Sequence, residues 1–235
     1  MAQSSSGPVK KGLMVFPGRT IVLPLRYCGN IGYYAAMAAC GRAVICADAL
    51  FDKRAKAVHR CDIADTHGPV SLTVPIAKPH GIARARWSDV RLSDHGAWWH
   101  VHRVTLESAY GRTPFFAYYI DRFLPYLTPG VMELCPTIAD LDLAIDSIIR
   151  EILLIDTEVS LCGGEVAAEE PECVENADMP AYYQVRAHRQ GFIPGLSVLD
   201  LIFNLGPEAP LYLRGLTDRL AHKHTACEVA HNHDV

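Results

Sequence analysis

The sequence lacks the features that mark membrane, secreted and nucleic-acid-binding proteins. None of its apolar runs reaches the roughly 18 residues that a membrane span needs, and residues 1–8 lack the apolar core of a secretory signal. The net charge of −4 over 235 residues does not favour a nonspecific nucleic-acid surface. We therefore predict a cytoplasmic protein with no membrane span and no nucleic-acid partner.

Paired cysteines are also missing. The eight cysteines form no C-x-x-C motif, and several, such as Cys40 and Cys46, lie in apolar segments where thiols pack as small hydrophobic groups. This usage is typical of a reducing compartment. No closed zinc spacing occurs, even among the tail histidines between His222 and His233, so we predict no metal site. The sequence identifies no cofactor.

Common catalytic fingerprints are absent as well. The segment 29–32 is too short for a dinucleotide or phosphate loop, and Ser197 has no flanking G-x-S-x-G elbow. Only Cys61 has an obviously electropositive setting, beside His59 and Arg60. Inert packing is the commoner role of such a thiol.

Apolar periodicity predicts the fold class. Residues 20–26 and 43–48 have the composition of buried strands, and Asn30 can cap a helix between them, which matches the size of a βαβ unit. We predict an α/β fold with a mostly parallel or mixed central sheet, flanking helices and a helical C-terminal half. Alternation at 70–76 and the segment 87–92 predict a hairpin or a sheet extension. Further elements are predicted at 97–110, 113–126, 137–152 (from a Thr137/Asp140 capping box), near 159, at 197–205 and at 208–222.

Composition also predicts the domain organisation. Residues 1–12 are expected to be disordered, and 13–222 to form a single α/β domain. An acidic, Gly-containing segment near 162–178 is expected to be a surface excursion. Residues 223–235 are expected to be a flexible, His-containing tail.

A basic segment is the first candidate binding site. Lys53, Arg54 and Arg60 gather there with His59, and guanidinium groups offer paired donors to phosphates and carboxylates. The alternative is a solvated edge strand protected by its charge. The partner on the first interpretation is a small anionic or sugar-linked molecule.

Polar residues on two predicted helices are the second set of candidates. His102 and Tyr110 could supply a general base and a hydrogen-bond donor. Alternatively, His102 is a core histidine that donates to a backbone carbonyl, and Tyr110 is an amphipathic residue packed beside it. Asp200 and Asn204 lie one helical turn apart and point the same way. They could orient a catalytic base and bind substrate, together with Ser197, or they could serve as helix caps.

The sequence resembles the WbqC-like protein family in three blocks. These are the segment 23–36, the segments 59–63 and 68–76, and, most specifically, Trp98-x-x-x-His102 through Phe116 with 191–206. Two departures occur: Phe51-Asp52 replaces the usual aromatic and Asn, and Cys28-Gly29 partly replaces the usual Pro.

The resemblance implies a function, and the residues above can be given roles in it. The family is associated with surface-polysaccharide gene clusters, and transfer of glycine or a related acyl group has been suggested for members. We therefore expect a small acyl- or aminoacyltransferase acting on a sugar amine or hydroxyl, or else a non-catalytic binding or scaffold protein of the same pathway. In the enzyme, His102 would deprotonate the acceptor, Tyr110 would stabilise the oxyanion and Asp200 would orient a catalytic group. The remaining candidates, Lys53, Arg54, His59, Arg60, Ser197 and Asn204, would bind substrate. His102, Tyr110, Arg60, Asp200 and Asn204 are predicted to line one concave site.

Overall fold

A parallel sheet forms the base of the protein. The computed structural model describes residues 16–78, 84–162 and 179–219. Within them, β1 (Phe16–Pro24), β2 (Cys40–Cys46) and β5 (Glu158–Leu161) pair in parallel in the order β1-β2-β5. The predicted parallel pairing of the first two strands and the strand near residue 159 are confirmed. The predictions for 1–12 and 223–235 lie outside the described residues, as does that for 162–178 apart from Cys162.

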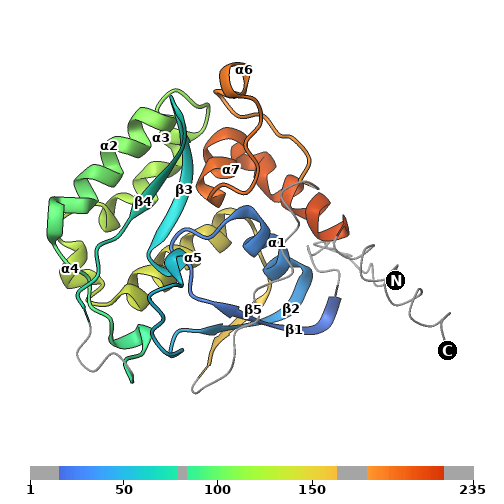
Figure 1. Cartoon of the computed structure of the whole chain (residues 1–235). Coiled ribbons are helices and arrows are strands. Elements are labelled where there is room, and N and C mark those ends of the chain that lie inside the picture. Colours follow the sequence, from blue (N-terminus) through green and yellow to red (C-terminus); the bar gives the residue numbers. More distant parts are fainter. Residues whose placement is uncertain (1–15, 79–83, 163–178, 220–235) are drawn as a thin grey trace, which may run out of the picture.

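The helix between β1 and β2 packs on this sheet (Figure 1). Helix α1 (Ile31–Ala39) begins after Asn30, whose side-chain oxygen accepts a hydrogen bond from the Tyr33 amide at 2.8 Å. Every residue of α1 is buried. The predicted βαβ unit is therefore correct, and the loop before α1 lies at one end of the sheet.

A separate antiparallel hairpin stands above the sheet. Its strands are β3 (Arg60–Asp65) and β4 (Gly68–Thr73), and the hairpin lies between α2 (Trp98–Tyr110) and α7 (Val198–Leu205) (Figure 1). The prediction of a strand at 87–92 is wrong over its first residues. Trp87–Asp89 form a 3-10 helix instead. The Trp87 ring is buried and its backbone amide donates a hydrogen bond to the Ala49 carbonyl, and these contacts hold the turn.

The helical half confirms one prediction made from the sequence and contradicts another. Helix α5 (Ile138–Ile152) begins with the predicted capping box of Thr137 and Asp140. The single helix predicted at 113–126 is instead broken into α3 (Phe116–Tyr119) and the 3-10 turns Ile120–Arg122 and Leu124–Tyr126. Thr113 does not cap it, because its hydroxyl donates back to the Tyr110 carbonyl at 2.7 Å. Pro125 then interrupts the hydrogen-bond ladder.

The C-terminal segments complete the fold. Short helices α4 (Val131–Leu134) and α6 (Ala187–Gln190) precede α7, and residues 209–219 are helical. Helix α7 ends as predicted at Gly206, whose φ is +51°. A Cβ atom at this position would lie 2.3 Å from the Phe115 ring, so a larger residue would clash there. The predicted α/β class, with a C-terminal half that is mostly helical, is confirmed.

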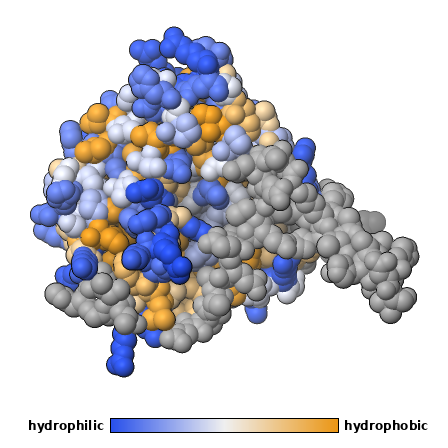
Figure 2. Space-filling model, in the orientation of Figure 1, coloured by the Kyte–Doolittle hydropathy of each residue, from blue (hydrophilic) through white to orange (hydrophobic). Residues whose placement is uncertain are grey.

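The surface mixes polar and apolar residues. The face in Figure 2 carries a group of strongly hydrophilic residues near its middle, with apolar residues around it. No helix in the described ranges is long and apolar enough to cross a membrane.

Candidate functional site

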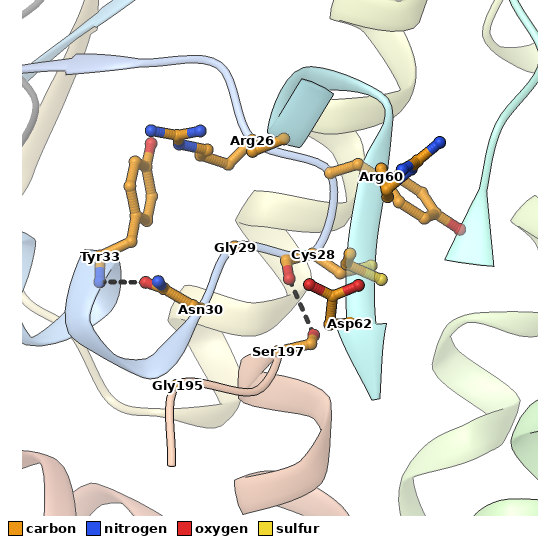
Figure 3. Close-up of a pocket in the computed structure, with 12 residues that line it drawn as sticks. Arg26, Cys28, Gly29, Asn30, Tyr33, Arg60, Asp62, Gly195 and Ser197 are labelled. Atoms are coloured by element: carbon orange, nitrogen blue, oxygen red, sulfur yellow. Dashed lines mark hydrogen bonds between the residues drawn. The ribbon is translucent and has the colours of Figure 1, made fainter. Parts of the chain in front are cut away.

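A pocket of about 170 Å³ opens where the loop before α1, the strand β3 and the start of α7 meet. Its lining includes Arg26, Cys28, Asn30, Arg60, Asp62 and Ser197 (Figure 3). A larger space of about 310 Å³ lies between β4 and α2, but apolar groups dominate its lining. We take the first pocket as the candidate site because charged side chains from separate segments meet there.

Ser197 joins the three walls of this pocket. Its amide donates to the Asp62 carbonyl at 2.7 Å, and its hydroxyl donates to the Cys28 carbonyl at 2.8 Å. The hydroxyl also accepts from the Leu199 amide as the N-cap of α7. The Ser197 hydroxyl is therefore committed to the fold, although the residue lines the pocket.

Charges of both signs surround the opening. The alternation of β3 places Arg60 and Asp62 on the same exposed face. In Figure 3 the Asp62 carboxylate points into the middle of the pocket, while Arg26 and Arg60 lie on opposite sides of it. The N-termini of α1 and α7 add positive potential at the same place. The pocket therefore suits a small molecule that carries both an anionic and a cationic group.

Only one member of the basic segment lines this pocket. Arg60 donates to the Thr73 hydroxyl at 3.0 Å and is exposed. Arg54 pairs with Asp52 at 3.1 Å on the surface, and Lys53 is exposed outside the lining. His59 donates from Nδ1 to the Val74 carbonyl at 3.2 Å, and partial burial lowers its pKa.

His102 lies outside this pocket and is almost fully buried, contrary to expectation, although it belongs to the lining of the larger space between β4 and α2. It is 2% exposed, and its Nε2 is 3.1 Å from the Thr73 carbonyl. A carbonyl only accepts, so Nε2 carries the proton and Nδ1 accepts from the Tyr27 hydroxyl at 3.0 Å. Burial lowers the pKa of His102 to about 4, so the ring is neutral at pH 7.

Asp200 sits in a third place, inside the core. Its carboxylate accepts hydrogen bonds from Tyr110 at 2.8 Å, Gln184 at 2.9 Å and Tyr182. Burial raises its pKa, although these donors oppose the shift. The predicted capping role is not seen, because the Asp200 side chain turns away from the start of α7.

Asn204 and Tyr110 extend the same network. Asn204 donates to the Asp200 carbonyl at 2.8 Å and accepts from the Val185 amide at 2.9 Å, while the Tyr110 oxygen accepts from the Ala64 amide at 3.2 Å. The network fixes the segment before α7 onto α7 and β3. The prediction that His102, Tyr110, Arg60, Asp200 and Asn204 line one concave site is therefore wrong. Arg60 lines the pocket, His102 lies behind it, and the other three share the core network.

A buried carboxyl lies below the pocket on α5. Asp142 is 1% exposed, and neither of its oxygens has a hydrogen-bond partner among the described residues. Burial raises its pKa well above the usual value, Asp146 and Cys61 add to the shift, and Arg26 opposes it. The folded protein therefore holds this proton to a higher pH than the unfolded chain does.

Replacing Asp142 with Asn should make the protein more stable at neutral pH. Wild-type stability falls as pH rises above about 4 through the raised pKa, because the unfolded chain ionises first. The variant should lack this loss, so it should be more stable than wild type at pH 8 and closer to it at pH 4. Urea unfolding at pH 4 and pH 8 measures it, with the exposed Asp156→Asn as control. An equal pH dependence in wild type and Asp142→Asn would contradict the prediction.

The sequence interpretation missed Arg26 and Asp62. A signal for Asp62 was present, because it lies two residues from Arg60 in a strand and so shares its face. No local signal marks Arg26, which reaches the pocket only through the turn that follows Leu25. No group of three or more metal-ligating side chains is found in the described ranges.

Comparison with known proteins adds one finding. The model of the WbqC-like protein family matches residues 26–172. The chain belongs to the WbqC-like family. The matched range holds Arg26, Arg60 and Asp62 and ends before Ser197. No curated protein and no solved structure matches the chain.

Proposed function

We propose that this WbqC-like protein transfers a small acyl or aminoacyl group, such as glycyl, to an amine or hydroxyl of a sugar in surface-polysaccharide biosynthesis. One observation carries the proposal: the carboxylate of Asp62 points into a small pocket whose lining also includes Arg26 and Arg60. The volume of about 170 Å³ is below the roughly 300 Å³ of sites for drug-sized ligands. The pocket therefore suits the small group that is transferred better than a whole nucleotide sugar.

The roles of the residues follow from this geometry. Arg60, with Arg26 across the pocket, neutralises a carboxylate or phosphate of the substrate. Asp62 binds the amino group, and it is the pocket carboxylate that can accept a proton from an attacking amine or hydroxyl. His102 supports the site from behind, through its hydrogen bond to Tyr27.

Reversing the charge of Arg60 should abolish binding of glycine, the probe for a small zwitterion. Isothermal titration should show heat for wild type and none for Arg60→Glu. The melting temperature should hardly change, because substitutions of exposed residues usually cost within about 0.5 kcal/mol.

Arg54→Glu is the matched control, since Arg54 is equally basic and exposed but lies outside the pocket. Acetate and ethylamine, each carrying one of the two charges, should bind more weakly than glycine. Equal binding of glycine by wild type and Arg60→Glu would reject this pocket as the site.

A non-catalytic binding protein is the second candidate. The observation in its favour is that His102, Tyr110, Asp200 and Asn204 are all hydrogen-bonded within the fold. Mass spectrometry of an amino sugar incubated with protein and a glycyl thioester separates the two. A glycylated product that Asp62→Asn fails to form supports the enzyme, whereas binding of glycine without product supports the second candidate.

A further inference from the structure

Two thiols share the wall of the candidate pocket. Cys28 comes from the loop before α1 and Cys61 from β3, and both line the pocket although they are 3% and 6% exposed. Cys61 occupies the inward position of β3 between the outward Arg60 and Asp62. Its side chain therefore points towards the floor beneath those charges.

Backbone contacts hold the two thiols near each other. Ser197 donates from its hydroxyl to the carbonyl of Cys28 and from its amide to the carbonyl of Asp62, the residue after Cys61. The Tyr27 amide also donates to the Ala57 carbonyl at 3.0 Å. The two chain segments are thus fixed on both sides of the cysteines.

The side chains themselves are in contact. A hydrogen bond with Cys61 is the main reason why the pKa of the Cys28 thiol is raised well above its usual value, and burial adds to the shift. Cys28 also has a φ of +44°, a left-handed conformation that side-chain-bearing residues rarely adopt. Such conformations persist where surrounding structure holds them, and they concentrate at functional sites.

We propose that Cys28 and Cys61 are a redox modification site that closes into a disulfide and narrows the candidate pocket. A peroxide is small enough to enter the pocket and is the oxidant. It converts one thiol to a sulfenic acid and releases one water, and the second thiol then attacks the sulfenic sulfur and releases a second water. Two thiols and one hydrogen peroxide give one disulfide and two waters.

The disulfide changes the shape of the pocket because it shortens the distance between the sulfurs. They move from non-bonded contact to a bond of about 2.05 Å. The loop that carries Arg26 is thereby drawn towards the strand that carries Arg60 and Asp62. The formation of the disulfide does not rest on the proposed function; only its effect on glycine binding does.

A second pair of neighbouring cysteines, Cys46 and Cys162, serves as a control for Cys28 and Cys61. Cys46 and Cys162 come one residue after the paired positions Ile45 and Leu161 of β2 and β5. Burial raises the pKa of Cys46, and the neighbouring Cys162 thiol adds to the shift. This pair lies away from the pocket lining. Cys135 is buried, and none of the cysteines in the described ranges perturbs its thiol.

The test treats the folded full chain with hydrogen peroxide, blocks remaining thiols with N-ethylmaleimide and maps linked peptides by mass spectrometry. A Cys28–Cys61 peptide, lighter by two hydrogens and lost after dithiothreitol, is expected. Cys28→Ser and Cys61→Ser should each abolish it, and Cys46→Ser should leave it in place. Formation should speed up as pH rises, because the thiolate is the reacting form.

Occupation of the pocket provides the second measurement. Glycine at ten times its Kd leaves about one pocket in eleven free, so crosslinking should slow about tenfold. Oxidised protein should bind glycine about tenfold more weakly, since a displacement of about 1 Å at a site is costly, and dithiothreitol should restore binding.

Three results would overturn the inference: no linked peptide, linkage of Cys28 or Cys61 to other cysteines, or unchanged glycine binding after linkage. If glycine does not bind the reduced protein at all, the proposed function fails while the linked peptide still decides whether the disulfide forms. A denatured sample should show no preference for the Cys28–Cys61 peptide.

Discussion

Replacing Asp200 with alanine should lower the free energy of unfolding by about 4 kcal/mol. The substitution removes the acceptor shared by Tyr110, Tyr182 and Gln184, all of which are buried. The Tyr110 and Tyr182 hydroxyls would then lie in the core without their acceptor, whereas Gln184 would keep its hydrogen bond to the Ile193 carbonyl. Urea denaturation monitored by circular dichroism measures the change.

Two further variants sharpen this prediction. Asp200→Asn keeps an acceptor oxygen and should cost less than Asp200→Ala, whereas the exposed Asp156→Ala should be nearly neutral. A catalytic Asp200 with little structural role would give the opposite pattern, with stability within about 1 kcal/mol of wild type and activity lost.

The second large effect is a loss of stability in acid that depends on His102. Its pKa is about 4 in the folded protein against 6.5 in the unfolded chain. As pH falls from 6.5 to 4, the unfolded chain binds a proton that the folded protein does not, so stability decreases over this window. The difference corresponds to about 3 kcal/mol at pH 4.

The variant His102→Phe tests this assignment. It keeps an aromatic ring on α2 but cannot titrate, and it leaves the Tyr27 hydroxyl and Thr73 carbonyl without their partner. Its stability should be lower at pH 7 and should fall less between pH 6.5 and 4. His100→Phe is the control, because His100 is exposed on the same helix. An acid loss that is unchanged in His102→Phe would show that other groups cause it.

The two pH effects run in opposite directions and can be separated. Asp142 contributes a loss as pH rises above about 4, and His102 contributes a loss as pH falls below 6.5. Each variant removes only one of them. Tyr27 bonds to His102 and is also influenced by Asp142, so the double variant measures how far the two effects are coupled.

Local sequence was enough to determine several elements. The helix α5 and its capping box depend on residues one or two turns apart, and the βαβ unit depends on apolar runs with a capping Asn30 between them. The end of α7 depends on Gly206 and the Pro207 that follows. These features were predictable because the interactions that produce them join neighbours in the chain.

The broken helix at 113–126 shows where such reasoning ends. Its residues have helical spacing, but Thr113 bonds backward to Tyr110 and the Phe115 amide donates to the Phe203 carbonyl on α7. A partner about 90 residues away thus decides the local backbone, and no window of the sequence contains it.

The candidate site divides in the same way. The sequence by itself determined that Arg60 is an exposed cation in a basic segment and that His102, Asp200 and Asn204 are unusual polar residues on apolar helices. Only the tertiary structure decided that Arg60 shares a pocket with Arg26 and Asp62, and that His102 and Asp200 are enclosed by partners from distant segments. The physical reason is that most buried polar groups are hydrogen-bonded, and the position of the partner is set by how the chain folds back on itself.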